Sequence, residues 1–172
     1  SAFLLASDWV PPELEPAYRS VVEHALDEVD ACFVRAGAVA QIRLHGDCHR
    51  GNLLWTDKGP HFVHFDDARS GPAVQDLWML LAGDRDEMAV QLGRVLDGYA
   101  DFRDFDPREL HLIEALRTLR LIHHAAWLAR RWDDPAFPTA FPWFDSPRYW
   151  QAHIRALREQ IAAMQEGPLV LR

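Results

Sequence analysis

Residues 44–55 read Leu44-His45-Gly46-Asp47-Cys48-His49-Arg50-Gly51-Asn52-Leu53-Leu54-Trp55, a polar loop between two apolar segments. Asp47 follows His45 by two residues, and Asn52 follows Asp47 by five. In a phosphotransfer catalytic loop of this spacing, the Asp accepts the proton of the attacking hydroxyl and the Asn holds Mg²⁺ beside the phosphates. The pattern therefore predicts a catalytic loop. The alternative is a turn in which Asp47 and Asn52 only satisfy backbone amides.

A second informative segment follows the loop and reads Asp66-Asp67-Ala68-Arg69-Ser70-Gly71-Pro72-Ala73-Val74-Gln75-Asp76-Leu77-Trp78-Met79-Leu80-Leu81. Together with residues 45–55, it resembles the aminoglycoside phosphotransferase and choline kinase superfamily. Within that superfamily the chain is most similar to the bacterial stress response kinase A type, a cytoplasmic protein kinase. The resemblance is dense over residues 44 to 81 and extends elsewhere only in the general pattern.

This resemblance implies a protein-kinase-like C-terminal lobe, mainly α with a small β-hairpin (α+β). It implies an ATP-dependent phosphotransferase that uses Mg²⁺ and moves the γ-phosphoryl group to a hydroxyl. Within the family it favours a serine/threonine kinase acting on protein over an enzyme acting on a small-molecule hydroxyl. The same fold serves both kinds of acceptor, so the sequence does not identify the substrate.

The resemblance also assigns roles to individual residues. Asp47 is expected to be the catalytic base, and Asn52 is expected to bind the cofactor by holding Mg²⁺. His45 is expected to stabilise the backbone of the loop rather than to transfer a proton. In the wider kinase fold an Asp at the position of Asp76 braces the catalytic loop, whereas Asp67 receives no definite role.

The second metal ligand departs from the family pattern. Similar proteins usually carry an Asp two residues before the Asp-Asp pair, and here that position is His64. A neutral imidazole is a poor ligand for Mg²⁺, which prefers oxygen donors. Side chains on a strand alternate between its two faces, so we expect Asp66 to lie on the same side as His64. We therefore predict that Asp66 supplies the metal-binding carboxylate, the alternative being a lobe that has lost metal-dependent activity.

Composition limits the classes of partner. The chain of 172 residues is 49% hydrophobic, which is enough for one domain spanning residues 1–172. Its formal net charge of −8 argues against nucleic acid or an anionic membrane as the main partner. No apolar run approaches the roughly 18 residues of a membrane span, and Ala2–Leu5 is too short for a signal peptide. A cytoplasmic location is the expectation.

Lysine usage suggests that part of a kinase is missing. Of the 18 basic residues, 17 are Arg, and the single Lys58 lies in an expected turn over residues 56–60. A complete kinase has a strand Lys and a glycine-rich loop that hold the triphosphate. Only 46 residues precede Asp47. We therefore predict a catalytic lobe whose partner is the absent N-terminal nucleotide-clamping lobe, and which is inactive alone.

Periodic apolar residues and helix-start signals predict the remaining elements. The expected helices cover residues 14–36, 73–81, 85–102, 107–128 and 147–166, with a β-like segment over 38–44. Two short strands over residues 53–55 and 61–65 are expected to form a hairpin, with Gly59-Pro60 between them. The segment from Arg131 to Pro147 is rich in proline and aromatic residues and is expected to be a loop, which could form a substrate wall.

Two further functions fit parts of the sequence. The first is a metal-dependent hydrolase with a transition metal bound by His45, Asp47, His49, His61 and His64. It leaves Asn52 and the segment from Asp66 to Leu81 unexplained. The second is a kinase-like binding module without catalysis, which His64 and the absent lobe would favour.

Overall fold

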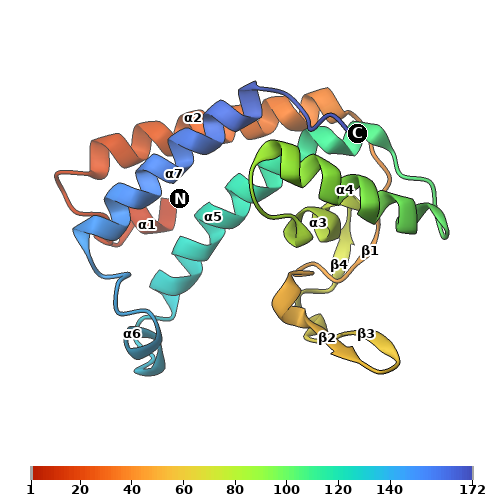
Figure 1. The fold of residues 1–172 in the computed structure, drawn as a ribbon. Helices are drawn as coiled ribbons and strands as arrows, with labels where there is room; N and C mark the ends of the chain where they lie inside the picture. Colours follow the sequence, from red (N-terminus) through yellow and green to blue (C-terminus); the bar gives the residue numbers. More distant parts are fainter. Residues whose placement is uncertain (1, 172) are drawn as a thin grey trace. The chain divides into compact units, whose positions relative to one another are not determined.

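The computed structural model describes residues 2–171, which form two compact units (Figure 1). The helical unit comprises residues 2–33 and 114–167, and the loop unit comprises residues 34–113 and 168–171. The composition predicts one domain over residues 1–172. Each unit has its own buried residues, and each is described separately below.

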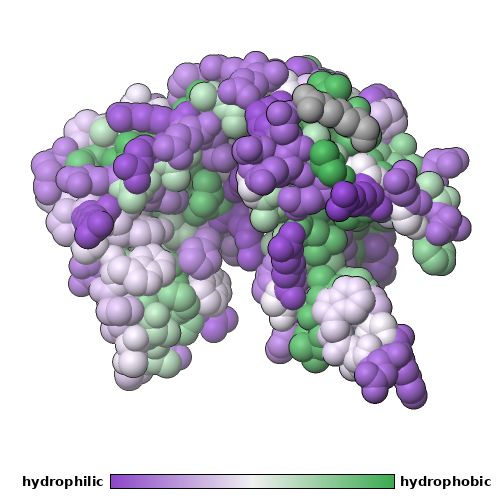
Figure 2. Space-filling view, viewed as in Figure 1, coloured by the Kyte–Doolittle hydropathy of each residue, from purple (hydrophilic) through white to green (hydrophobic). Residues whose placement is uncertain are grey.

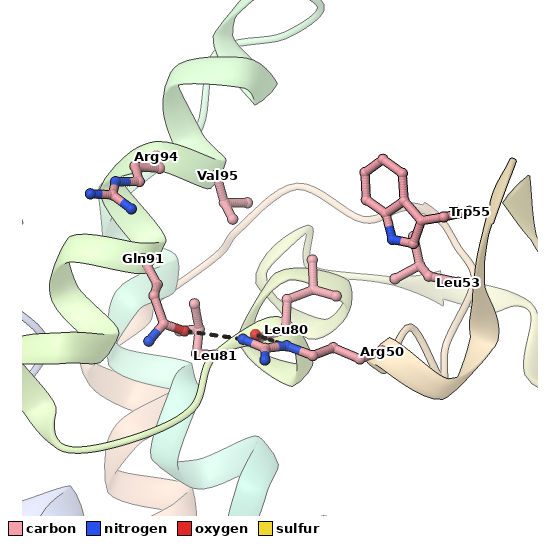
Figure 3. A pocket seen from close by; sticks show the side chains of 8 residues that line it. All are labelled: Arg50, Leu53, Trp55, Leu80, Leu81, Gln91, Arg94 and Val95. Carbon is pink, nitrogen blue, oxygen red and sulfur yellow. Dashed lines mark hydrogen bonds between the residues drawn. The ribbon is translucent and has the colours of Figure 1, made fainter. Parts of the chain in front are cut away.

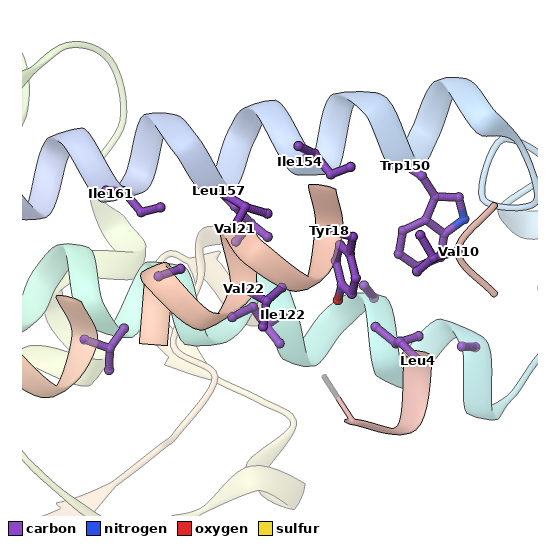
Figure 4. Close-up of a cluster of buried hydrophobic side chains, with 14 of the residues drawn as sticks. Leu4, Val10, Tyr18, Val21, Val22, Ile122, Trp150, Ile154, Leu157 and Ile161 are labelled. Carbon is purple, nitrogen blue, oxygen red and sulfur yellow. The ribbon is translucent and has the colours of Figure 1, made fainter. Parts of the chain in front are cut away.

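The helical unit contains α1 (Ala2–Ala6), most of α2 (Glu15–Ala36), nearly all of α5 (Ile113–Arg130), α6 (Ala136–Ala140) and α7 (Pro147–Gln165). Its core forms where the apolar faces of α2, α5 and α7 meet. Figure 4 shows Val22 of α2, Ile122 of α5 and Leu157 of α7 pointing into this cluster. The three- and four-residue spacing of apolar residues in each helix produces these faces.

One end of this core is aromatic. The Tyr18 ring lies 5.6 Å from Trp150 and 5.9 Å from His153, between ring centroids, and His153 also stacks on Tyr149 at 5.7 Å. His153 Nε2 is buried and has no hydrogen-bond partner among residues 2–171. Burial, together with a smaller contribution from the neighbouring His124, lowers the pKa of His153 to about 4. The neutral imidazole is therefore the form that suits this site.

The loop unit contains two short antiparallel sheets and several helices. Strand β1 (Ile42–Leu44) pairs with β4 (Arg69–Gly71), and β2 (Leu53–Thr56) pairs with β3 (Gly59–Phe62). The chain continues through α3 (Val74–Leu77), α4 (Arg85–Ala100) and a 3₁₀ helix over Pro107–Leu112. A mainly helical lobe with a small hairpin is thus confirmed. The β1–β4 pairing brings the two ends of residues 44–69 together around the catalytic-loop sequence.

Several predicted boundaries are wrong. The hairpin turn is Asp57-Lys58, whereas Gly59 and Pro60 belong to β3, where Pro60 pairs with Trp55. A two-stranded hairpin has only edge strands, which tolerate a proline. β3 also ends at Phe62 rather than at Phe65.

The predicted helices lie at nearly the expected positions, but parts of two of them are 3₁₀ helices instead of α-helices. The helix expected from Pro107 begins as a 3₁₀ helix and becomes α5 only at Ile113. The helix expected over residues 73–81 is α3 followed by a 3₁₀ turn over Trp78–Leu80. Strand β4 and helices α1 and α6 were not predicted, because elements of three to five residues are too short to show a hydrophobic period. No helix within residues 2–171 is both long enough and apolar enough to cross a membrane.

Candidate active site

The loop between β1 and β2 is held at its start by a carboxylate from α3. Asp76 accepts hydrogen bonds from the backbone N–H groups of His45 at 2.7 Å and Gly46 at 2.9 Å. A carboxylate that accepts two backbone amides is a strong, charge-assisted anchor. The prediction that Asp76 braces the loop is therefore confirmed.

The His45 side chain ties the loop to the segment after β3. Its Nδ1 accepts the Asp47 backbone N–H at 3.3 Å, and its Nε2 lies 2.7 Å from the Val63 carbonyl oxygen. Because Nδ1 is an acceptor, Nε2 carries the hydrogen and donates it to Val63. Both ring nitrogens are thus occupied in a side chain only 7% exposed. This arrangement agrees with the expected role of His45, which is to stabilise the backbone of the loop.

Asp47 and Asn52, predicted to share one reaction centre, are in contact. Asn52 Nδ2 donates to the Asp47 carbonyl oxygen at 2.9 Å and approaches Asp47 Oδ2 at 3.4 Å. The side-chain oxygen of Asn52 accepts no hydrogen bond from any residue that the structure describes. That oxygen is the kind of neutral, hard donor that can bind Mg²⁺. Asn52 is 7% exposed, so its amide is held in one orientation.

His49 belongs to the same site, although the phosphotransfer interpretation of the sequence gave it no role. Its Nδ1 accepts the Gly51 backbone N–H at 3.0 Å, and its Nε2 lies 3.4 Å from Asp47 Oδ2. With Nδ1 accepting, neutral His49 carries its hydrogen on Nε2, facing the carboxylate. The only signal in the sequence was its place two residues after Asp47.

Gly46 brings the Asp66-Asp67 segment against the loop. Its φ of 88° lies in the left-handed region, and a Cβ at this position would clash with the Asp67 carbonyl oxygen. The Gly46 carbonyl oxygen accepts hydrogen bonds from Arg69 Nη2 at 3.2 Å and Gln75 Nε2 at 3.4 Å. Only glycine allows this close approach of two backbone segments.

His64 and Asp66 do not lie on a strand. His64 has φ 63° and ψ 63°, a left-handed conformation, and it precedes a 3₁₀ helix over Phe65–Asp67. The strand alternation from which we argued that Asp66 faces the same side as His64 is therefore wrong. Asp66 is exposed on that 3₁₀ helix. Its role as a metal ligand remains a prediction that rests on the chemistry of its carboxylate.

The backbone next to His64 is nevertheless fixed to the candidate catalytic loop. The Val63 N–H donates to the Asn52 carbonyl oxygen at 3.1 Å, while the Val63 carbonyl oxygen accepts from His45. Both polar backbone groups of the residue before His64 are thus bound to the loop. The segment that begins at His64 consequently starts beside Asn52.

Cys48 lies in the middle of the loop but is not a good nucleophile. It is buried, and burial together with the nearby carboxylates of Asp76 and Asp47 raises the pKa of its thiol to about 11. The thiolate is the reactive form of cysteine, so this thiol stays unreactive near neutral pH. Asp47 is therefore the stronger candidate for chemistry in the loop.

The five residues of the hydrolase hypothesis are not gathered around one point. Within residues 2–171, no three His, Cys, Asp or Glu side chains are arranged to hold a metal ion. His45 is bound to Val63 and Asp47, and His61 Nε2 lies 2.9 Å from Thr56 Oγ1. A Mg²⁺ site differs in this respect, because Mg²⁺ commonly uses one or two protein oxygens together with substrate phosphates and water.

Comparison with known proteins is consistent with this geometry. The profile of the phosphotransferase enzyme family matches residues 2–113. Stress response kinase A of Escherichia coli (strain K12) is 48% identical over 162 residues, which make up 94% of this chain and 48% of that protein. The serine/threonine protein kinase RdoA of Salmonella typhimurium is 46% identical, with the same coverage. The chain spans about half the length of the curated relatives it matches.

Proposed function

Because the chain belongs to the phosphotransferase enzyme family, we propose that it is the catalytic lobe of an ATP-dependent kinase that transfers the γ-phosphoryl group to a hydroxyl. The observation that carries the proposal is the contact between Asp47 and Asn52 in a loop anchored by Asp76. Phosphoryl transfer depends on positioning and charge stabilisation rather than on a covalent intermediate. A rigid loop that presents a carboxylate beside an amide meets that requirement.

In the proposed reaction, Asp47 orients the acceptor hydroxyl and accepts its proton as the hydroxyl oxygen bonds to the γ-phosphorus of ATP and the bond from that phosphorus to the leaving ADP breaks. His49 Nε2, 3.4 Å from Asp47 Oδ2, supports one carboxylate orientation. Asn52, through its side-chain oxygen, and Asp66 are the residues that would hold Mg²⁺. When bound, Mg²⁺ supplies charge neutralisation at the phosphates of ATP.

We further propose that the acceptor is a Ser or Thr hydroxyl of a protein. The support is the similarity to relatives named stress response kinase A and serine/threonine protein kinase. A small-molecule hydroxyl is the alternative, since the loop chemistry is the same for both. A cytoplasmic location and a role in the stress response are part of the same proposal.

An N-terminal nucleotide-clamping lobe is the proposed partner. Leu54, Phe62 and Phe65 are each about half exposed on and beside the β2–β3 hairpin, although all three are large and apolar. Figure 2 shows hydrophobic and intermediate surface along this hairpin and hydrophilic surface at its turn. Exposed apolar patches of this kind mark surfaces that another body covers. Alone, the chain is expected to bind ATP weakly and to transfer no phosphoryl group.

The test is Asp47→Asn in the complete enzyme, meaning this chain together with that lobe. The substitution keeps the shape and removes the base, so turnover should fall by about 10²- to 10⁴-fold. Phosphate transfer from labelled ATP measures the rate, and circular dichroism confirms the fold. Near-normal turnover would show that Asp47 is structural and would leave the non-catalytic binding module as the better interpretation.

A further inference from the structure

A groove in the loop unit lies beside the catalytic loop and has no part in the proposed reaction. It encloses about 430 Å³ between the β2–β3 hairpin and α4. Leu53 and Trp55 line its hairpin side, Val95 lines its α4 side, and Leu80 and Leu81 lie between them (Figure 3). We propose that this docking groove binds a segment of the acceptor protein that carries an apolar side chain next to an acidic one. This inference rests on the proposed function.

The charge at one side of the docking groove comes from Arg50. Its Nε donates to the Leu80 carbonyl oxygen at 3.2 Å, and its Nη2 reaches Gln91 Oε1 at 3.5 Å. Gln91 is itself fixed, because its side chain forms hydrogen bonds with both the N–H and the carbonyl oxygen of Ala82. The guanidinium is thus held in place by neutral acceptors, and its positive charge is not neutralised.

A second arginine stands nearby on α4. Arg94 lines the docking groove, is exposed, and forms no ion pair or hydrogen bond with any residue that the structure describes. Two uncompensated positive charges lie here on a chain whose formal net charge is −8. Such a local basic site would attract carboxylates and favour acidic partners over basic ones. Charge complementarity therefore identifies the acidic part of the ligand.

Trp55 indicates that the peptide ligand also carries an apolar side chain. Its side chain is 77% exposed, although tryptophan is among the residues that contribute most when buried in an interface. Leu53 lies two residues earlier on the same strand, so both side chains point to one face of the hairpin. An aliphatic or aromatic side chain inserted between Trp55 and Val95 would be covered on both sides.

Size and position favour a peptide segment. A volume of about 430 Å³ accommodates one or two side chains rather than a folded domain. Arg50 is three residues after Asp47 in the same loop. A segment held at Arg50 would therefore keep a neighbouring hydroxyl close to the proposed base, which is the positioning that phosphoryl transfer requires.

The test measures binding and needs no catalysis. A positional-scanning library of fluorescein-labelled nine-residue peptides with a central Ser is titrated with the 172-residue chain, and fluorescence polarisation is recorded. The wild-type chain should select Asp or Glu at one position and an aliphatic or aromatic residue at an adjacent one. Arg50→Gln and Arg94→Gln should each weaken binding of the selected acidic peptide by about two- to fivefold, the range expected for an exposed ion pair.

Trp55→Ala should weaken binding about tenfold and abolish the apolar preference, because it removes a central anchor. Arg43→Gln is the matched control, since Arg43 is an exposed arginine of the same unit that does not line the docking groove. Circular dichroism shows that each variant is folded. The control variant should bind like the wild type.

Three results would overturn the proposal. The first is a library without acidic preference, or one that does not bind. The second is an acidic preference that survives both arginine substitutions. The third is evidence that something else occupies the docking groove. ATP would be that occupant if it displaced the peptide, and a second copy of the chain would be if the chain self-associated in sedimentation experiments and Trp55→Ala abolished the self-association. None of these results depends on phosphoryl transfer, so the proposed function would remain open to its own test.

Discussion

The carboxylate of Asp76 accepts the backbone N–H of His45 at 2.7 Å, across 31 residues of sequence. The contact joins α3 to the first residue of the candidate catalytic loop. Because it uses a backbone donor, it fixes the path of the chain independently of the His45 side chain. The imidazole remains available to bind Asp47 and Val63. A single carboxylate outside the loop thus contributes to the geometry of the whole site.

Asp76→Asn should destabilise the loop unit. Asp76 accepts two backbone N–H groups, and an amide has only one oxygen to accept them. Leaving one buried donor unpaired should lower the free energy of unfolding by about 1–3 kcal/mol. Urea denaturation followed by circular dichroism measures the change. Asp57→Asn in the exposed hairpin turn is the control and should have little effect. Equal stability of the two variants would contradict the bracing role.

Gly46→Ala should lower the stability of the loop unit more than the addition of one methyl group usually does. The left-handed φ of 88° disfavours alanine, and the added methyl group would meet the Asp67 carbonyl oxygen. The expected loss of stability is about 1–3 kcal/mol, and phosphotransfer in the complete enzyme should fall with it. Gly98→Ala in α4 is the matched control, because a Cβ there meets no atom within 4 Å. A thermal melt of Gly46→Ala that coincides with that of the control would refute the argument.

The metal ligand is tested by substitutions at two positions of the complete enzyme. Asp66→Ala should abolish Mg²⁺-dependent turnover if Asp66 supplies the carboxylate, whereas His64→Ala should have a mild effect. His64→Asp should preserve or raise turnover, because it adds a hard oxygen ligand and because Asp tolerates the left-handed conformation found there. Rates are measured over a Mg²⁺ titration. Full turnover by Asp66→Ala would move the second ligand to another residue.

Acid should destabilise the helical unit through His153. Its pKa is about 4 in the folded chain, against about 6.5 for an ordinary histidine, so the unfolded chain binds the proton more readily. The stability gained by keeping this imidazole neutral is present above about pH 6.5 and is lost as the pH falls towards 4. Between pH 7 and pH 5 the loss should be about 2 kcal/mol.

His153→Phe should remove this part of the pH dependence, because phenylalanine keeps a ring between Tyr18 and Tyr149 without a proton to gain. Thermal melts from pH 7.5 to pH 5 measure the effect. His123→Phe is the control at an exposed histidine, and it should keep the wild-type slope. A slope that His153→Phe leaves unchanged would assign the acid sensitivity to other groups.

The long helices and the residues of the candidate catalytic loop could be predicted from local sequence. α2, α4 and α7 have apolar residues at helical spacing, and Asp47 and Asn52 stand at a fixed separation in one loop. Short elements could not be predicted in this way. β4 has only three residues, and it is a strand because its backbone pairs with that of β1. The partner strand lies about 25 residues earlier in the sequence, so local sequence does not reveal the pairing.

By itself, the sequence determined which residues share the candidate site, because the spacing of His45, Asp47 and Asn52 within one short loop restricts where their side chains can lie. Only the tertiary structure decided how the residues after β3 are oriented. The left-handed turn at His64 arises where Val63 is bound to the loop on both sides, and it ends the alternation from which Asp66 was placed. Backbone dihedral angles at such a junction depend on long-range hydrogen bonds, and the period of a strand carries no information about them.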